Sequence, residues 1–175
     1  MFSRTTEYSL RVVVFLATLK GVPATTRQIA ATTRVPEGYL SKILQNLSRA
    51  KLIRSQRGLH GGSVLTRNPA ELTVYDVVEA TGPMQRIRSC PLALESHGSH
   101  LCALHRRLDD AMAMVEEVLH GCTLADLLGE INSSIPLKDV GTSAAADIRV
   151  AEAVFRVSRG SPPTVSVHKP AKRSR

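Results

Sequence analysis

Two short helices joined by a tight turn constrain this fold more than any other feature of the sequence. The stretch TTRQIAATT opens with a predicted capping box, in which Thr25 accepts a hydrogen bond from the backbone of Gln28 and Gln28 reaches back. After Arg34 and Val35, a second helix is expected with Pro36 at its first helical position. Helix, turn and helix in this order predict a helix-turn-helix.

The second of these helices is amphipathic. In PEGYLSKILQNLSRAKL, one face collects apolar residues at helical spacing, namely Leu40, Ile43, Leu44, Leu47 and Ala50. The opposite face carries mainly hydrogen-bonding side chains, namely Tyr39, Ser41, Lys42, Gln45 and Arg49. Because the apolar face requires burial, the polar face remains available for a partner, as in a recognition helix.

A glycine-tipped hairpin is predicted to follow. LIRSQRGLHGGSVLTR alternates in polarity, turns over residues 57–62 and alternates again. The three glycines permit backbone angles that other residues resist, and they allow close approach to another backbone. A basic hairpin after a recognition helix is a wing, from which Arg54 and Arg57 can reach a phosphate or a minor groove.

Charge is unevenly distributed along the 175 residues. Residues 1–67 carry eleven lysines and arginines against two glutamates, hence +9 within a total of +8. Residues 68–135 carry four basic and ten acidic residues, hence −6, and residues 136–175 carry eight and three, hence +5. A basic N-terminal half favours double-stranded DNA as partner. The alternative is a basic surface that only keeps the chain soluble.

The remaining pattern is helical. A helix is expected over residues 3–20, and TVYDVVEATG and TLADLLGEI follow predicted capping boxes. The fold class is therefore mainly α with a small β-hairpin wing. We expect a winged helix-turn-helix domain over 1–82, a ligand loop, long dimerisation helix and short helix over 83–132, and a disordered basic tail over 133–175.

The long helix is expected over residues 101–120, before Gly121. Its apolar residues recur every three or four positions, namely Leu101, Leu104, Leu108, Ala111, Met112, Val115, Val118 and Leu119. The stripe either packs on its own domain or on a second copy. Since the first eighty residues already form a closed small domain, we predict a homodimer through residues 101–120.

The start of the chain lacks a signal-peptide pattern, and no apolar run is long enough to cross a bilayer. We therefore expect a cytoplasmic chain with no membrane partner and with reduced thiols. Three cysteines cannot all pair within one chain, so ligand, redox and buried roles all stay open. Cys122, beyond the long helix, is expected to be a buried structural thiol.

Taken in order, the segments resemble the Rrf2 family of winged-helix transcriptional regulators, which includes IscR and NsrR. The resemblance covers roughly residues 1–132 and rests on TTEYSLRVVVFLA, TRQIAATTRVPEGYLSKILQNLSRAKLI, SQRGLHGGSVL, TVYDVVEATG and TLADLL. It implies a dimeric DNA-binding protein, usually a repressor. By position it implies DNA contacts from Glu37, Gly38, Tyr39, Ser41 and Lys42, with Arg57 on the wing. The surfaces predicted above add Gln45 and Arg54.

The resemblance also implies a ligand set, because many members hold an iron–sulfur cluster through three cysteines near the start of the long helix. Cys90 matches the first cysteine and Cys102 the third, and His105 follows one helical turn later, as in IscR-like members. The middle cysteine is missing, and the loop offers His97 and His100 instead. In some members, a carboxylate on the first helix supplies a cluster ligand from the other subunit, and Glu7 stands near that position.

These side chains suit a 2Fe–2S or 4Fe–4S cluster or a zinc ion, since histidine can replace cysteine on iron. The alternative is that no metal is bound and they are ordinary core and solvated residues. We expect a sequence-specific regulator, a repressor, that senses redox state, iron or nitric oxide through such a centre. A second possibility is a metal-free regulator controlled by a partner protein or a small molecule.

A third possibility is a thiol enzyme, with Cys90 or Cys102 as nucleophile and His105 as base. The sequence offers no oxyanion-hole loop and no third group that would orient the histidine. A helix-turn-helix and a wing would also be idle in such an enzyme. We therefore expect that the chain is not an enzyme.

Overall fold

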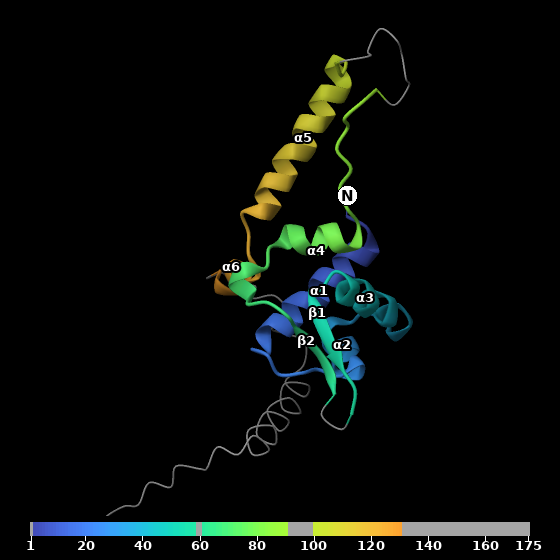
Figure 1. Cartoon of the computed structure of the whole chain (residues 1–175), viewed down its shortest axis with the longest axis vertical. Helices are drawn as coiled ribbons and strands as arrows, with labels where there is room; N and C mark the ends of the chain where they lie inside the picture. Colours follow the sequence, from blue (N-terminus) through green and yellow to red (C-terminus); the bar gives the residue numbers. More distant parts are fainter. Residues whose placement is uncertain (1, 59–60, 91–99, 131–175) are drawn as a thin grey trace, which may run out of the picture.

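The structure, a computed structural model, describes residues 2–58, 61–90 and 100–130 (Figure 1). The tail predicted over 133–175 lies outside the described residues. The fold is mainly helical with one two-stranded antiparallel hairpin, as expected. Its elements are α1 (Arg4–Thr18), α2 (Thr26–Thr33), α3 (Glu37–Arg49), β1 (Ile53–Gln56), β2 (Gly62–Leu65), the 3-10 helix η1 (Pro69–Glu71), α4 (Val74–Thr81), α5 (Ala103–His120) and α6 (Leu124–Gly129).

Helix α1 forms the centre of an aliphatic core. It packs against α2, α3, α4, α6 and β2, and its residues from Val12 to Ala17 are all buried. Helix α3 contributes Leu40, Ile43 and Leu47, each at most 1% exposed. Burial of a large aliphatic side chain stabilises a fold by about 1.5–3 kcal/mol. These three residues therefore fix which face of α3 points outward.

The capping boxes predicted for three helices are confirmed, whereas the long helix begins at Ala103 and not at residue 101, because Cys102 is its N-cap residue. Reciprocal capping boxes join Thr25 with Gln28, Thr73 with Asp76, and Thr123 with Asp126. Two details of α3 were wrong. Pro36 is the N-cap residue, so the first helical residue is Glu37, and Ala50 is an exposed C-cap residue because the helix ends at Arg49.

The turn between α2 and α3 is closed by Arg34, which adopts a left-handed conformation with φ 56° and ψ 28°. Such a conformation costs a non-glycine residue about 1–3 kcal/mol, so neighbouring contacts must hold it. Val35 next to it is 2% exposed and belongs to the hydrophobic core. The buried valine thus anchors the turn that sets the angle between the two helices.

The hairpin pairs Ile53 with Leu65 and Gln56 with Gly62, so the expected wing is present. It is also tied to the connection between α1 and α2, which the sequence did not predict. The amide of Ala24 donates to the Ser63 carbonyl at 3.0 Å, and the amide of Ser63 donates to the Ala24 carbonyl at 2.8 Å. This bridge places the hairpin beside the helix-turn-helix.

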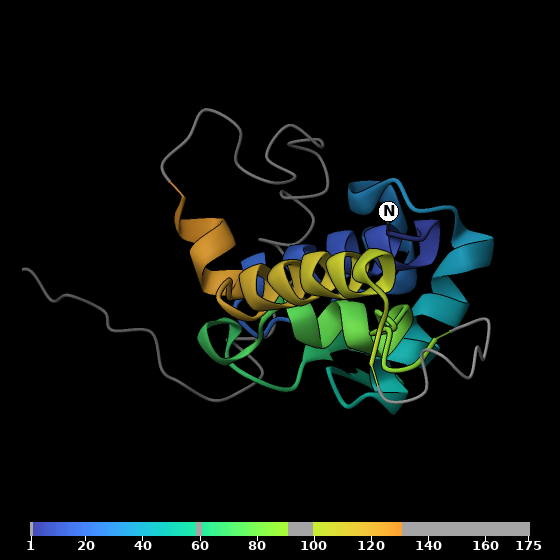
Figure 2. The same ribbon diagram turned by 90° about the horizontal axis from the view of Figure 1, so that it is seen from above.

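Helix α5 leaves this body as an arm (Figure 1). Helix α5 packs on α4, and none of its residues is buried. At its C-terminal end, the ring of His120 stacks on the ring of Tyr75 in α4, with centroids 3.7 Å apart. From above, α5 projects over α1 and α4, while α3 lies to one side (Figure 2). Residues 83–90 run back beside α5 toward its start (Figure 1). The arm therefore has little contact with the core.

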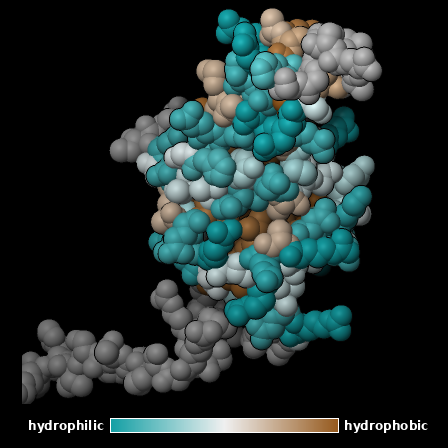
Figure 3. Space-filling model, turned by 45° about the horizontal axis from the view of Figure 1, so that its top comes forward, coloured by the Kyte–Doolittle hydropathy of each residue, from teal (hydrophilic) through white to brown (hydrophobic). Residues whose placement is uncertain are grey.

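Apolar side chains on the arm remain exposed. The largest are Leu104 at 64%, Leu108 at 46%, Met114 at 67%, Val115 at 43% and Val118 at 70%. Figure 3 shows apolar surface near the free end of the arm, among hydrophilic residues. The predicted stripe is thus not covered by the described part of its own chain.

After the arm, the chain returns to the core. Thr123 pairs with Thr73, and the amide of Leu124 donates to the Leu72 carbonyl at 2.9 Å. Leu124 is 0% exposed and completes the core against α1. No helix in the described ranges has the length and apolar character needed to cross a membrane.

We expect substitution at Gly62 to loosen the wing. A Cβ there would lie 2.6 Å from the Ala24 carbonyl oxygen, whereas at Gly58 no described atom lies within 4 Å. Both glycines have positive φ, at 159° and 114°. Gly62→Ala should therefore lower the free energy of unfolding by more than about 2 kcal/mol, and Gly58→Ala by about 1 kcal/mol. Urea denaturation followed by circular dichroism measures both, and equal costs would contradict the role of the bridge.

Candidate nucleic-acid interface and ligand-bearing arm

The candidate interface on α3 consists of side chains that the buried face leaves outside. All six residues predicted on this helix are exposed, namely Glu37, Gly38, Tyr39, Ser41, Lys42 and Gln45. They alternate with buried Leu40 and Ile43, as helical geometry requires. Tyr39 is 57% exposed, a large value for an aromatic side chain with an apolar ring. The face therefore offers hydrogen-bonding groups, one cation, one carboxylate and one aromatic ring to a partner.

The first turn of α3 is supported by α1, which the sequence analysis missed. The rings of Tyr8 and Tyr39 meet edge to face, with centroids 6.1 Å apart and planes at 76°. Arg11 lies over the Tyr8 ring at 5.5 Å and donates to the Thr33 carbonyl at 3.4 Å. These contacts hold Tyr39 and the end of α2 in one arrangement.

Glu7 belongs to the same cluster. Its carboxylate accepts a hydrogen bond from Nε of Arg11 at 2.6 Å and is about half exposed. An exposed pair one helical turn apart stabilises a helix by only a few tenths of a kcal/mol. Glu7 therefore has a cationic partner on its own helix, and its role as a ligand for a second subunit stays a prediction.

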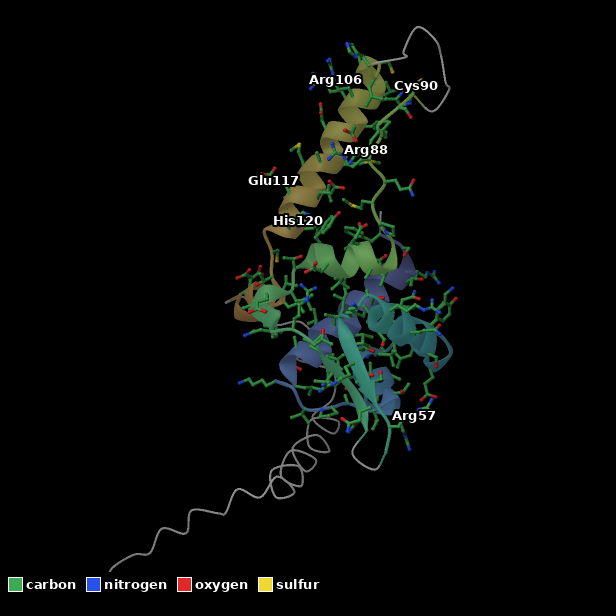
Figure 4. The ribbon with its side chains drawn as sticks, in the orientation of Figure 1. Arg57, Arg88, Cys90, Arg106, Glu117 and His120 are labelled. Atoms are coloured by element: carbon green, nitrogen blue, oxygen red, sulfur yellow. The ribbon has the colours of Figure 1, made fainter. Side chains whose placement is uncertain are left out.

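The wing presents both predicted arginines. Arg54 and Arg57 are exposed, and Arg57 lies at the end of the hairpin opposite to the arm (Figure 4). An open hollow of about 260 Å³ separates the hairpin from the start of α2. Its lining includes Thr25, Thr26 and Leu44 together with Ser55, Gln56 and Ser63 of the hairpin, so hydroxyl groups are common in it.

At the free end of the arm, Cys102 is the N-cap residue of α5 and His105 lies in the first turn. The Cys102 Sγ is 3.3 Å from the His105 Nδ1, so the predicted one-turn spacing brings them together. In a tetrahedral zinc site, a sulfur at about 2.3 Å and a nitrogen at about 2.05 Å lie about 3.6 Å apart. The pair therefore fits one edge of such a site.

The other predicted ligands are less clearly placed. Cys90 is half-buried and lies beside the first part of α5 (Figure 4), and His100 is exposed. His97 lies outside the described residues. Within residues 2–58, 61–90 and 100–130, no three histidine, cysteine or acidic side chains come together closely enough to hold a metal ion. The described residues thus place two candidate ligands in contact, with the Cys90 thiol beside the first part of α5.

Cys122 lies at the opposite end of α5, which spans about 27 Å for its 18 residues. It is partly rather than fully buried, and burial, with Asp126 and Glu130 nearby, raises the pKa of its thiol. A raised pKa lowers the thiolate fraction, which is the form that binds metal. Cys122 is therefore separate from the Cys102 pair within one chain.

An ion-pair cluster joins the segment before the loop to α5. Arg86 donates two hydrogen bonds of 2.7 Å to the two oxygens of Asp109 and one of 3.2 Å to Glu116. The hydrogen bonds from Arg86 are the main reason that the pKa of Asp109 is lowered from 3.8 to about 2. A lowered carboxyl pKa means that the contact between residues 86–87 and α5 is favoured above about pH 4 and weakens as pH falls toward 2. The cluster is thus intact at neutral pH.

Comparison with known proteins identifies the chain's relatives. Residues 2–130 match the Rrf2 family, described as iron-dependent transcriptional regulators. NsrR of Geobacillus kaustophilus, an HTH-type transcriptional regulator, is 36% identical over 129 residues, covering 70% of this chain and 86% of that protein. CymR of Bacillus subtilis, also an HTH-type transcriptional regulator, is 34% identical over 123 residues, covering 69% and 84%.

Solved structures show the same architecture. CymR, the global cysteine regulator of B. subtilis, superposes with a TM-score of 0.60 at 29% identity, covering 73% of this chain and 95% of that one. IscR of T. potens superposes with a TM-score of 0.60 at 26% identity, covering 73% and 85%. These relatives are regulators, which sets aside the thiol-enzyme hypothesis. The chain has the winged helix-turn-helix fold and belongs to the Rrf2 family of transcriptional regulators.

Proposed function

We propose that this chain is a sequence-specific repressor that binds duplex DNA as a homodimer. The observation that carries the proposal is the exposed polar face of α3, held outward by buried Leu40, Ile43 and Leu47 and flanked by the basic hairpin. A helix fits the major groove of DNA, where each base pair presents its own pattern of donors and acceptors. An adjacent hairpin can then reach the neighbouring phosphates or minor groove.

The cationic side chains and the polar or aromatic side chains have different roles in the proposed DNA contact. Lys42, Arg54 and Arg57 are cations suited to phosphate contacts, which supply affinity and position the protein. Tyr39, Ser41 and Gln45 carry donors, acceptors and a ring suited to base edges, which supply sequence preference. The Tyr8 ring packs against Tyr39, and Arg11 packs on Tyr8, so the exposed face of α3 is preorganised.

The homodimer is proposed on the exposed stripe of α5. Its residues are spaced four, three, four and three positions apart, namely Leu104, Leu108, Ala111, Val115 and Val118. This series is nearly symmetric about Ala111. An antiparallel second copy centred there would set Leu104 against Val118 and Leu108 against Val115. Such pairing buries the apolar face that the described part of the chain leaves open, and a two-fold dimer suits a two-fold operator.

We further propose that the arm carries a metal or iron–sulfur centre that reports redox state, iron or nitric oxide. Cys102 and His105 already fit one edge of a tetrahedral site, and Cys90 and His100 are the further candidates among the described residues. A bound cluster would supply a redox-sensitive iron, whereas zinc would supply only a fixed tetrahedral link. Since α5 carries both the ligands and the dimer stripe, occupancy of the site would bear directly on the dimer. A coupling of about 1–3 kcal/mol changes affinity by one to two decades.

A metal-free regulator is the second candidate. The family's middle cysteine is missing, and within the described residues no three candidate ligands come together closely enough to hold a metal ion. Relatives include both NsrR and CymR, and CymR is described as a cysteine regulator. In this case a partner protein or a small molecule would supply the signal.

The DNA-binding surface predicts a strong dependence on salt. With a duplex selected from random sequence by the protein itself, Lys42→Ala and Arg57→Ala should each weaken binding about three- to tenfold at 0.1 M salt. Each should also reduce the slope of log Kd against log salt by about 1. Arg88→Ala is the matched control, because Arg88 lies on the segment beside α5, far from the hairpin (Figure 4). Equal effects in all three variants, measured by fluorescence anisotropy, would count against this surface.

The dimer predicts a substitution pattern on opposite faces of α5. Leu108→Glu places a charge in the proposed seam and should yield a monomer at micromolar concentration in light scattering. Arg106→Glu is the control, since Arg106 lies two residues from Leu108 and thus on a different face of the helix. Loss of the dimer in both variants, or in neither, would contradict pairing through this stripe.

The centre predicts bound metal after anaerobic purification. Iron with sulfide, or zinc, should be present in the parent protein and should fall severalfold in Cys102→Ser, because a thiolate ligand is lost. Cys122→Ser should retain the parent content, since that thiol lies at the other end of α5. Elemental analysis and optical spectra give the answer. A parent protein with neither iron nor zinc would favour the metal-free regulator.

A further inference from the structure

We propose that Arg86 is a positioning residue, which fixes the register of residues 86–90 against α5 and thereby holds Cys90 level with Cys102. The importance of this register for metal binding rests on the proposed metal centre. The register itself depends only on contacts within this chain, so it can be tested without any metal.

The clamp has three components, all converging on one face of α5. The guanidinium of Arg86 grips Asp109 through two parallel hydrogen bonds of 2.7 Å each. The backbone amide of Ile87 donates to the same carboxylate at 2.8 Å. Arg86 also reaches Glu116 at 3.2 Å, two turns further along α5. One carboxylate thus fixes both a side chain and the adjacent backbone, which a single surface ion pair would not do.

Burial strengthens the clamp. The side chains of Asp109 and Glu116 are each 19% exposed and that of Arg86 is 29% exposed. A two-pronged arginine–carboxylate contact is directional, because the planar fork matches the carboxylate in only a few orientations. Lysine could supply the charge but not the fork. The geometry therefore selects arginine at this position.

The register follows from chain lengths measured from Asp109. Ile87 is bonded to Asp109, and Cys90 lies three residues further, at most about 10 Å along an extended chain. Cys102 lies seven residues back along the helix, about 10.5 Å at 1.5 Å per residue. Because the segment runs toward the start of α5, the two distances point the same way (Figure 1). These lengths allow Cys90 to reach the level of Cys102, the N-cap residue of α5, and Figure 4 shows Cys90 beside the first part of that helix.

Fixing the register raises the effective concentration of the Cys90 thiol at the Cys102 thiol. Eleven residues separate Cys90 from Cys102 along the chain. Two groups joined by a short linker reach an effective concentration in the millimolar range. A segment already fixed three residues before Cys90 has less freedom to lose, so the two ligands are preorganised for one site.

The test measures that effective concentration as a disulfide equilibrium, in the full chain with Cys122→Ser and without metal. In glutathione buffers, two thiols reduce one glutathione disulfide, forming the protein disulfide and two molecules of glutathione. Mass spectrometry under non-reducing conditions counts the disulfide formed within one chain. Adding Arg86→Ala should lower the effective concentration about tenfold, and Arg86→Lys should lower it by several fold. Arg88→Ala removes an exposed cation on the same segment that acts on Asp109 through its charge and not through the two-pronged contact, so its value should stay within twofold of the parent.

Three results would overturn the proposal: no disulfide within the parent chain, an Arg86→Ala value equal to the parent, or an equal loss in Arg88→Ala. Thermal unfolding and DNA binding should stay near parent values in Arg86→Ala, because the clamp lies on the arm and not in the core. If they do not, Asp109→Asn replaces it, since this change keeps the side-chain shape and should give the same loss. Cobalt(II) titration of the reduced parent tests the metal centre separately. Absence of cobalt binding with an intact disulfide effect would overturn the centre and leave the clamp in place.

Discussion

Leu40, Ile43 and Leu47 anchor α3 to the aliphatic core, and the orientation of the candidate DNA-reading surface depends on that anchoring. Because these residues are buried, helical geometry directs the side chains of Tyr39, Ser41, Lys42 and Gln45 toward solvent. The core itself is built almost wholly from valine, leucine and isoleucine around α1. The bridge between Ala24 and Ser63 then fixes the hairpin beside the helix-turn-helix, so reading helix and wing form one surface.

The arm contrasts with this core. Helix α5 buries none of its residues and is held at its root by the Tyr75–His120 stack and along its length by the Arg86 cluster. An element with few buried contacts opens more easily than a core helix. Such an element suits regulation, because a ligand or a second copy can change its position at low cost. In the proposed function, the core holds the DNA-reading surface in place and the arm responds to the signal.

The sequence predicted those features that depend on close neighbours. Each capping box needs two residues three positions apart, and Cys102 and His105 share a face through the same short spacing. Ala50 shows the limit, because helical periodicity continued past Arg49, where the chain leaves the helix. The bonds of Arg86 to Asp109 and Glu116 span 23 and 30 residues, so no local pattern reveals them. The Ala24–Ser63 bridge and the Tyr8–Tyr39 contact likewise arise only when distant elements pack together.

The central claim is that α3 and the hairpin together bind duplex DNA while the arm stays outside the interface. Hydrogen–deuterium exchange of the full chain, with and without a selected duplex, tests it most directly. The account predicts slower exchange on DNA binding over residues 37–45 and 53–65, with exchange over 103–120 little changed. Protection confined to 103–120, with no change in α3 or the hairpin, would contradict it.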